Sequence, residues 1–82
     1  MLQQYHIIFY KPLSKLLKGI PVEHQERIIE KIEFLRNGLS GDVKKLTNQE
    51  EYRLRVGNYR VLFIVEETTI TILSIKHRQG VY

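Results

Sequence analysis

Residues 52–60, YRLRVGNYR, contain the loop Gly57-Asn58 between two stretches that alternate apolar and other side chains. A two-residue Gly-Asn loop is a strong β-hairpin signal, because both residue types tolerate the positive φ that tight primed turns need. We therefore predict an antiparallel hairpin in which Val56 pairs with Tyr59. This pairing fixes the face of the sheet on which every other side chain of the two strands lies.

The predicted register gathers three arginines on one face. Arg55 lies directly opposite Arg60, and Arg53 shares their face through the two-residue repeat of a strand. Like charges placed opposite each other destabilise a sheet, so we expect something anionic to offset this cost. The alternative is a solvated face on which the arginine stems cover apolar surface.

The remaining pattern predicts a single α+β domain over residues 1–82. Strands are indicated by alternation, and helices by apolar residues at positions i, i+3, i+4 and i+7. The element order β-α-α-β-β-β predicts a helical hairpin packed on a mostly antiparallel four-stranded sheet. Besides the hairpin, whose second strand runs to Glu66, the expected elements are a strand at 3–10, a helix at 13–20, a helix from Pro21 to Asn37-Gly38, a polar loop at 37–51 and a strand at 69–77.

Composition and charge narrow the classes of function. The net charge is +4, and residues 43–82 hold seven Lys/Arg against four Asp/Glu, which favours an anionic partner for the C-terminal half. The absence of cysteine excludes disulfides and thiolate metal sites, and His6 and His24 stand isolated from other ligands, so we expect no metal and no cofactor. Neither a signal peptide nor an apolar run of membrane length is present, so we expect a cytoplasmic protein.

Further candidate side chains flank the hairpin. They are Lys44 and Lys45 before it, and Lys76, His77, Arg78 and Tyr82 around the end of the last strand. Arginines bind phosphate bidentately and aromatic rings stack on unpaired bases, so the set suits RNA.

The same set suits RNA cleavage by attack of a ribose 2′-hydroxyl. That reaction needs a base, fixed cations around the phosphate and an acid for the leaving 5′-oxygen. Histidine changes charge near neutral pH, so His77 is the candidate for proton transfer, and a purely structural histidine is the alternative. Glu50 and Glu51 are further possible bases, or part of a solvated loop.

Three segments carry a resemblance to a known family. "KKL", "YRLRVGNYRVLFIV" and "ITILSIKHRQGVY" together resemble the RelE/ParE superfamily of bacterial and archaeal toxins, most closely its RelE branch. The resemblance implies the toxin of a type II toxin–antitoxin pair. It implies an mRNA interferase that enters the ribosomal A site, cleaves mRNA there without a metal and so inhibits translation.

The family's functional positions fall on Arg53, Arg55, Arg60, Arg78 and Tyr82, and His77 matches a position that is basic or histidine in relatives. We expect the basic residues Lys44, Lys45 and Lys76 to bind RNA together with Arg53 and Arg55. Relatives carry lysines where this chain has Arg53 and Arg55, and one of those lysines is thought to be the general base. Arginine keeps its proton at neutral pH, so either His77, Lys45 or a glutamate takes that role, or the activity is weak or absent.

The resemblance also implies partners and leaves other functions open. The expected partners are a cognate antitoxin, the ribosome with mRNA in its A site, and operator DNA through the antitoxin alone. One alternative is a ParE-like poison of DNA gyrase without catalysis. Another is a non-toxic, antitoxin-bound corepressor.

Overall fold

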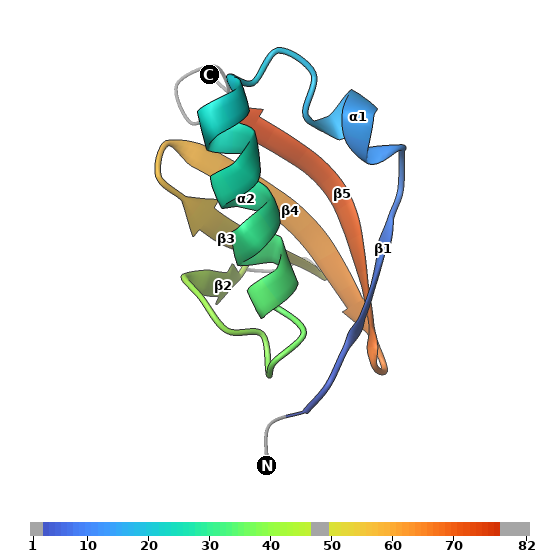
Figure 1. The fold of residues 1–82 in the computed structure, drawn as a ribbon. Coiled ribbons are helices and arrows are strands. Elements are labelled where there is room, and N and C mark those ends of the chain that lie inside the picture. Colours follow the sequence, from blue (N-terminus) through green and yellow to red (C-terminus); the bar gives the residue numbers. More distant parts are fainter. Residues whose placement is uncertain (1–2, 47–49, 78–82) are drawn as a thin grey trace.

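The computed structural model describes residues 3–46 and 50–77 (Figure 1). Its elements are β1 (His6–Phe9), α1 (Leu13–Leu16), α2 (Val22–Phe34), β2 (Val43–Lys45), β3 (Glu51–Val56), β4 (Tyr59–Glu66) and β5 (Thr69–His77). The expected α+β class and the order of the expected elements are confirmed. Within the described part of the chain, neither helix has the length and apolar character needed to cross a membrane.

The strands form one sheet in the order β1-β5-β4-β3-β2, with β1 parallel to β5 and the other neighbours antiparallel. The sheet has five strands, not the expected four, because β2 lies within the segment expected to be a loop. This strand has one apolar residue, Val43, which pairs with Leu54. The backbone N–H of Arg55 also donates to the carbonyl of Asp42 at 3.0 Å. Pairing with β3, and not local apolar periodicity, therefore makes β2 a strand.

The β3–β4 hairpin has the predicted register, with Val56 paired to Tyr59. Gly57 adopts a φ of +57°, whereas Asn58 is not among the residues with positive φ. A glycine at positive φ in the first loop position alone is typical of a type II′ turn, whose twist matches that of the flanking strands.

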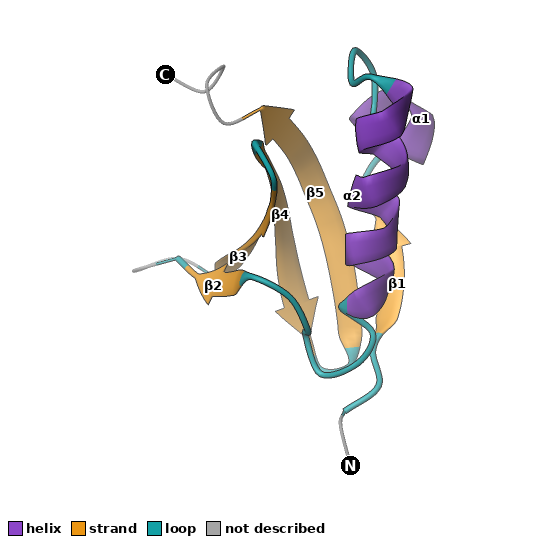
Figure 2. Cartoon of the chain, turned by 60° about the vertical axis from the view of Figure 1, so that its left-hand side comes forward, coloured by secondary structure: helices purple, strands orange, loops and turns teal. Residues whose placement is uncertain are grey.

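Helices α1 and α2 lie on one face of the twisted sheet, and no described element covers the other face (Figure 2). α1 ends at Leu16, earlier than expected, because the chain turns at Gly19, whose φ is +83°. The core lies between the helices and the sheet. On the helix side its fully buried members are Ile28 and Ile32 of α2 and Leu35, which follows α2 directly. On the sheet side they are Leu54 of β3, Val61 and Phe63 of β4, and Ile70 and Ile72 of β5.

Two glycines outside the helices allow a direct test of backbone strain. A Cβ on Gly57 would meet no atom within 4 Å, whereas a Cβ on Gly41 would lie 3.0 Å from Cδ1 of the buried Leu54, at a φ of +117°. We expect Gly57→Ala to destabilise the fold by about 1 kcal/mol through strain alone. We expect Gly41→Ala to cost about 2–3 kcal/mol, because strain and overpacking add. Urea unfolding of both variants measures the difference, and equal losses would contradict it.

Candidate functional site

The sheet face that no described helix covers carries a cluster of five cationic side chains, which we call the arginine face: Lys44, Arg53, Arg55, Arg60 and Lys76. Two rows of paired residues build it. Arg55 pairs with Arg60, which pairs in turn with Lys76 on β5. Arg53 pairs with Lys44 on β2, one row further from the hairpin loop. Four strands therefore contribute to one cationic surface.

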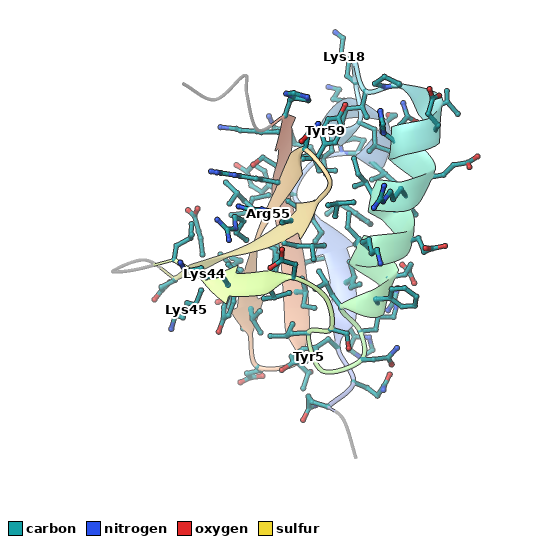
Figure 3. The ribbon with its side chains drawn as sticks, turned by 90° about the vertical axis from the view of Figure 1, so that its left-hand side faces the viewer. Tyr5, Lys18, Lys44, Lys45, Arg55 and Tyr59 are labelled. Atoms are coloured by element: carbon teal, nitrogen blue, oxygen red, sulfur yellow. The ribbon has the colours of Figure 1, made fainter. Side chains whose placement is uncertain are left out.

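Burial of the intervening residues shows which way these side chains point. Leu54 and Val61 are completely buried and Val56 is nearly so, all against the helices. Successive residues of a strand alternate between faces, so Arg55 and Arg60 lie on the face away from α2. Figure 3 shows Arg55 on the side of the sheet opposite α2.

The charges of Arg53 and Arg55 are not compensated by the part of the chain that the structure describes. Their Nε atoms are shielded from solvent and have no hydrogen-bond partner there. The ion pair between Arg36 and Glu33 lies outside the arginine face. A buried donor without a partner costs about 1–3 kcal/mol, so an acceptor that binds here recovers that energy. A phosphate or a carboxylate supplies such acceptors.

The same face also carries apolar side chains. Leu62 pairs with Arg53, Ile64 follows two residues later, and Ile8 on β1 is 51% exposed. Glu51 stands opposite Ile64 and shares the face with the arginines through the two-residue repeat of β3. The sequence pattern alone allows Glu51 to lie in a solvated loop, and only the pairing of β3 with β4 places this residue on the face of the arginines.

Two of the expected site residues lie on the other side of the sheet. His77 pairs with Tyr59, and their rings meet edge to face at 5.0 Å on the helix side. Lys45 pairs with Tyr52, and its Nζ lies 5.9 Å from the centre of that ring. Arg78 and Tyr82 lie outside the described residues. The structure thus brings together five of the nine expected residues and separates His77 and Lys45 from them.

Metal ligands do not gather among residues 3–46 and 50–77, where no group of three or more His, Cys, Asp or Glu side chains could hold an ion. The charge available for binding an anion on this surface comes from guanidinium and ammonium groups. Guanidinium groups bind oxyanions with fixed geometry through two parallel donors, whereas ammonium groups bind them as point charges.

Removal of one opposed arginine is expected to stabilise the free protein. Arg55→Thr replaces a charge that faces another arginine with a strand-forming residue, and we expect a gain of about 0.5 kcal/mol in the free energy of unfolding. Chemical denaturation at low salt measures it. Arg36→Thr, which removes the same charge elsewhere, is the control and should give no gain. A loss of stability in Arg55→Thr would show that Arg55 already has a partner.

Comparisons with known proteins agree with this architecture. Residues 7–82 match the family described as the ParE toxin of the type II toxin–antitoxin system parDE. Toxin RelE3 of Methanocaldococcus jannaschii is 35% identical over 82 residues, which cover 93% of each protein.

Solved structures show the same fold. The RelB–RelE antitoxin–toxin complex from Methanococcus jannaschii contains a chain with a TM-score of 0.76 and 35% identity, covering 92% of this chain and 94% of that one. The archaeal RelE–RelB complex from Pyrococcus horikoshii gives a TM-score of 0.75 and 30% identity, covering 93% of this chain and 97% of that one. The chain therefore belongs to the RelE/ParE superfamily of type II toxin–antitoxin toxins, as a RelE-like member.

Proposed function

We propose that this protein is a toxin that cleaves mRNA on the ribosome, without a metal, by attack of a ribose 2′-hydroxyl on the adjacent phosphate. The observation that carries the proposal is the arginine face, on which the Nε donors of Arg53 and Arg55 have no acceptor among the described residues. Similarity to RelE toxins supports the same reading. A phosphodiester offers the oxyanion that these donors fit.

In the proposed reaction the arginines hold the scissile phosphate and stabilise the charge that grows on its oxygens. Arg55 and Arg60 are directly opposed, so their guanidinium groups approach one phosphate from two strands. Each preorganised donor of this kind raises the rate of the chemical step by a factor of about 10²–10³. The bond from the 2′-oxygen to phosphorus forms as the bond from phosphorus to the 5′-oxygen breaks, which leaves a cyclic phosphate.

Proton transfer requires groups on the same face. We assign the base to Glu51, because its carboxylate shares the arginine face, whereas His77 lies on the helix side of the sheet. Lys76, paired with Arg60, is the donor placed to protonate the leaving 5′-oxygen. Arg78 and Tyr82 keep the roles that the family resemblance implies, phosphate binding and contact with a base.

This assignment predicts different results for two variants. Glu51→Gln keeps the shape of the side chain and removes its ability to accept a proton, so we expect cleavage to fall by about 10²-fold or more. His77→Gln should retain most of the activity in the same single-turnover assay on ribosome-bound mRNA. A large loss in His77→Gln with little change in Glu51→Gln would transfer the role back to His77.

We also propose a cognate antitoxin that covers the arginine face. The face combines cations with the apolar residues Leu62, Ile64 and Ile8, so it fits an acidic segment that also carries apolar side chains. Two relatives of known structure, at 35% and 30% identity, were solved as RelB–RelE complexes. Contact with operator DNA would come through the antitoxin, and the site of action would be the cytoplasm.

Primer extension on mRNA from cells that express the protein tests the proposal. Cuts confined to translated frames, and lost when the start codon of a reporter is removed, are the expected result. Intact mRNA would reject the nuclease.

One alternative has its own support, because the matching family model is that of ParE toxins. A gyrase poison would leave mRNA intact and break DNA in the same cells. A non-toxic corepressor would do neither and would leave growth unchanged.

A further inference from the structure

A second cationic site lies on the opposite side of the β3–β4 hairpin. A cavity of about 190 Å³ opens between α2 and the hairpin loop. Its polar lining comes from four elements: His24 and Arg27 from α2, Asn58 from the loop, Tyr59 from β4 and His77 from β5. Of the described residues that line the cavity, none is acidic.

Three rings form one wall of this cavity. The centre of the Tyr59 ring lies 5.5 Å from that of His24 and 5.0 Å from that of His77. Tyr59 is only 9% exposed, so the ring is held by the core while the two histidines are open to solvent. The wall is therefore rigid at its centre and presents hydrogen-bonding groups at its edges.

The position of the α2 residues is also fixed. The side-chain amide of Gln25 donates to the carbonyl of Ile20 at 2.7 Å, which ties the first turn of α2 to the preceding loop. Arg27 lies on the same helix with Ile28, which is completely buried. No carboxylate of the described residues lies within 4.0 Å of the Arg27 guanidinium. Its charge is available to a bound group.

The cavity and the arginine face share the same end of the hairpin. Val56 and Tyr59 flank the loop on the helix side, while their neighbours Arg55 and Arg60 point to the other face. A single-stranded RNA that bends over the loop can therefore contact both cationic surfaces. The cavity volume of about 190 Å³ is many times the roughly 10–15 Å³ that a cavity needs, on the same measure, to hold one water, so there is room for a phosphate.

We propose that this cavity binds a backbone phosphate of single-stranded RNA, as a second contact of the same substrate strand. Arg27 supplies the charge, and His24 and Asn58 supply further donors. RNA is favoured over an acidic peptide because donors line the cavity from both α2 and the hairpin loop, as a phosphate with several oxygens requires, and because the aromatic wall suits an adjoining nucleotide. This inference rests on the proposed function for the identity of the substrate.

The test uses the purified full chain and an eight-nucleotide RNA with 2′-O-methyl groups, which cannot be cleaved by the proposed reaction. In ¹H–¹⁵N spectra we expect RNA to shift the amides of Gly57, Asn58 and Arg27 together with those of β3 and β4. Arg27→Ala should weaken binding about tenfold and make the slope of log K against log salt shallower by about 0.7, the value for one phosphate on a single strand.

Arg36→Ala is the matched control, because it removes the same side chain just past the other end of α2. The exposed side chain of Arg36 is hydrogen-bonded to its neighbour Glu33, and this bond raises the pKa of Arg36 above its ordinary value. Its removal should leave the salt slope within error of the unsubstituted chain. Arg27→Lys should restore the slope but only part of the affinity, because lysine binds phosphate as a point charge.

Two results would overturn the inference. In the first, RNA shifts the amides of β3 and β4 but leaves those of the cavity unmoved, or Arg27→Ala behaves like Arg36→Ala. In the second, a glutamate-rich peptide shifts the cavity amides and RNA does not, which would assign the cavity to a protein partner. Neither result depends on cleavage, so the nuclease proposal stands or falls separately by primer extension.

Discussion

Cells that express the Arg60→Ala variant are expected to grow normally and to keep their translated mRNA intact. Arg60 stands at the centre of the arginine face, between Arg55 on β3 and Lys76 on β5. Its loss removes a cation placed next to the phosphate in the proposed site. We expect the rate of cleavage to fall by about 10²–10³-fold, the effect of removing one preorganised donor from a transition-state site.

The experiment needs proof that the variant is folded. Arg60 is half-buried at a strand position on the face away from the core, so truncation should leave the cooperative unfolding transition in place. Arg36→Ala controls for the loss of one positive charge and should remain fully toxic. Full toxicity of a folded Arg60→Ala would remove the main support for the nuclease and favour a target that is bound without catalysis.

Phe63→Ala is expected to destabilise the fold severely. Phe63 is completely buried, and its ring stacks on that of Tyr52 at 5.4 Å. Removal of a buried phenylalanine ring costs about 3–5 kcal/mol. A chain of 82 residues is stable by about 4–12 kcal/mol, so the variant should be partly or largely unfolded at 37 °C.

Urea unfolding followed by circular dichroism measures this loss. The control is Phe34→Ala, which removes the same ring from the end of α2, where Phe34 is 46% exposed. We expect the control to cost about 1 kcal/mol, because surface positions contribute little and its contact with Lys31 is a weak cation–π pair. Similar losses in the two variants would mean that the core does not depend on Phe63.

The hairpin could be predicted in detail from the sequence because its signals are local. The Gly-Asn loop and the alternation around it define the register, and with it the opposition of Arg55 and Arg60. The last strand was predicted with its observed bounds, 69–77, for the same reason. β2 was not predicted, because a strand with one apolar residue forms only where a neighbouring strand offers partners.

The face on which His77 lies could not be read from its position beside Lys76 and Arg78. It depends on the pairing of β5 with β4, which places His77 opposite Tyr59, and that pairing includes an irregularity between Leu62 and Phe63. A shift of one residue reverses the face of every side chain beyond it. The cavity beside His24 was missed for a related reason, since no sequence spacing connects α2 with the hairpin loop.

The parallel pairing of β1 with β5 joins the first and the last strand of the described residues. During synthesis, β1 therefore has no place in the sheet until β5 has left the ribosomal exit tunnel, because β5 separates it from β4. Contacts between distant parts of a chain also form slowly. Lys76 lies on β5 and becomes part of the arginine face only when β5 pairs with β4. A nascent or prematurely terminated chain without β5 therefore lacks the complete surface. The strand order thus delays the assembled site until β5 has been translated.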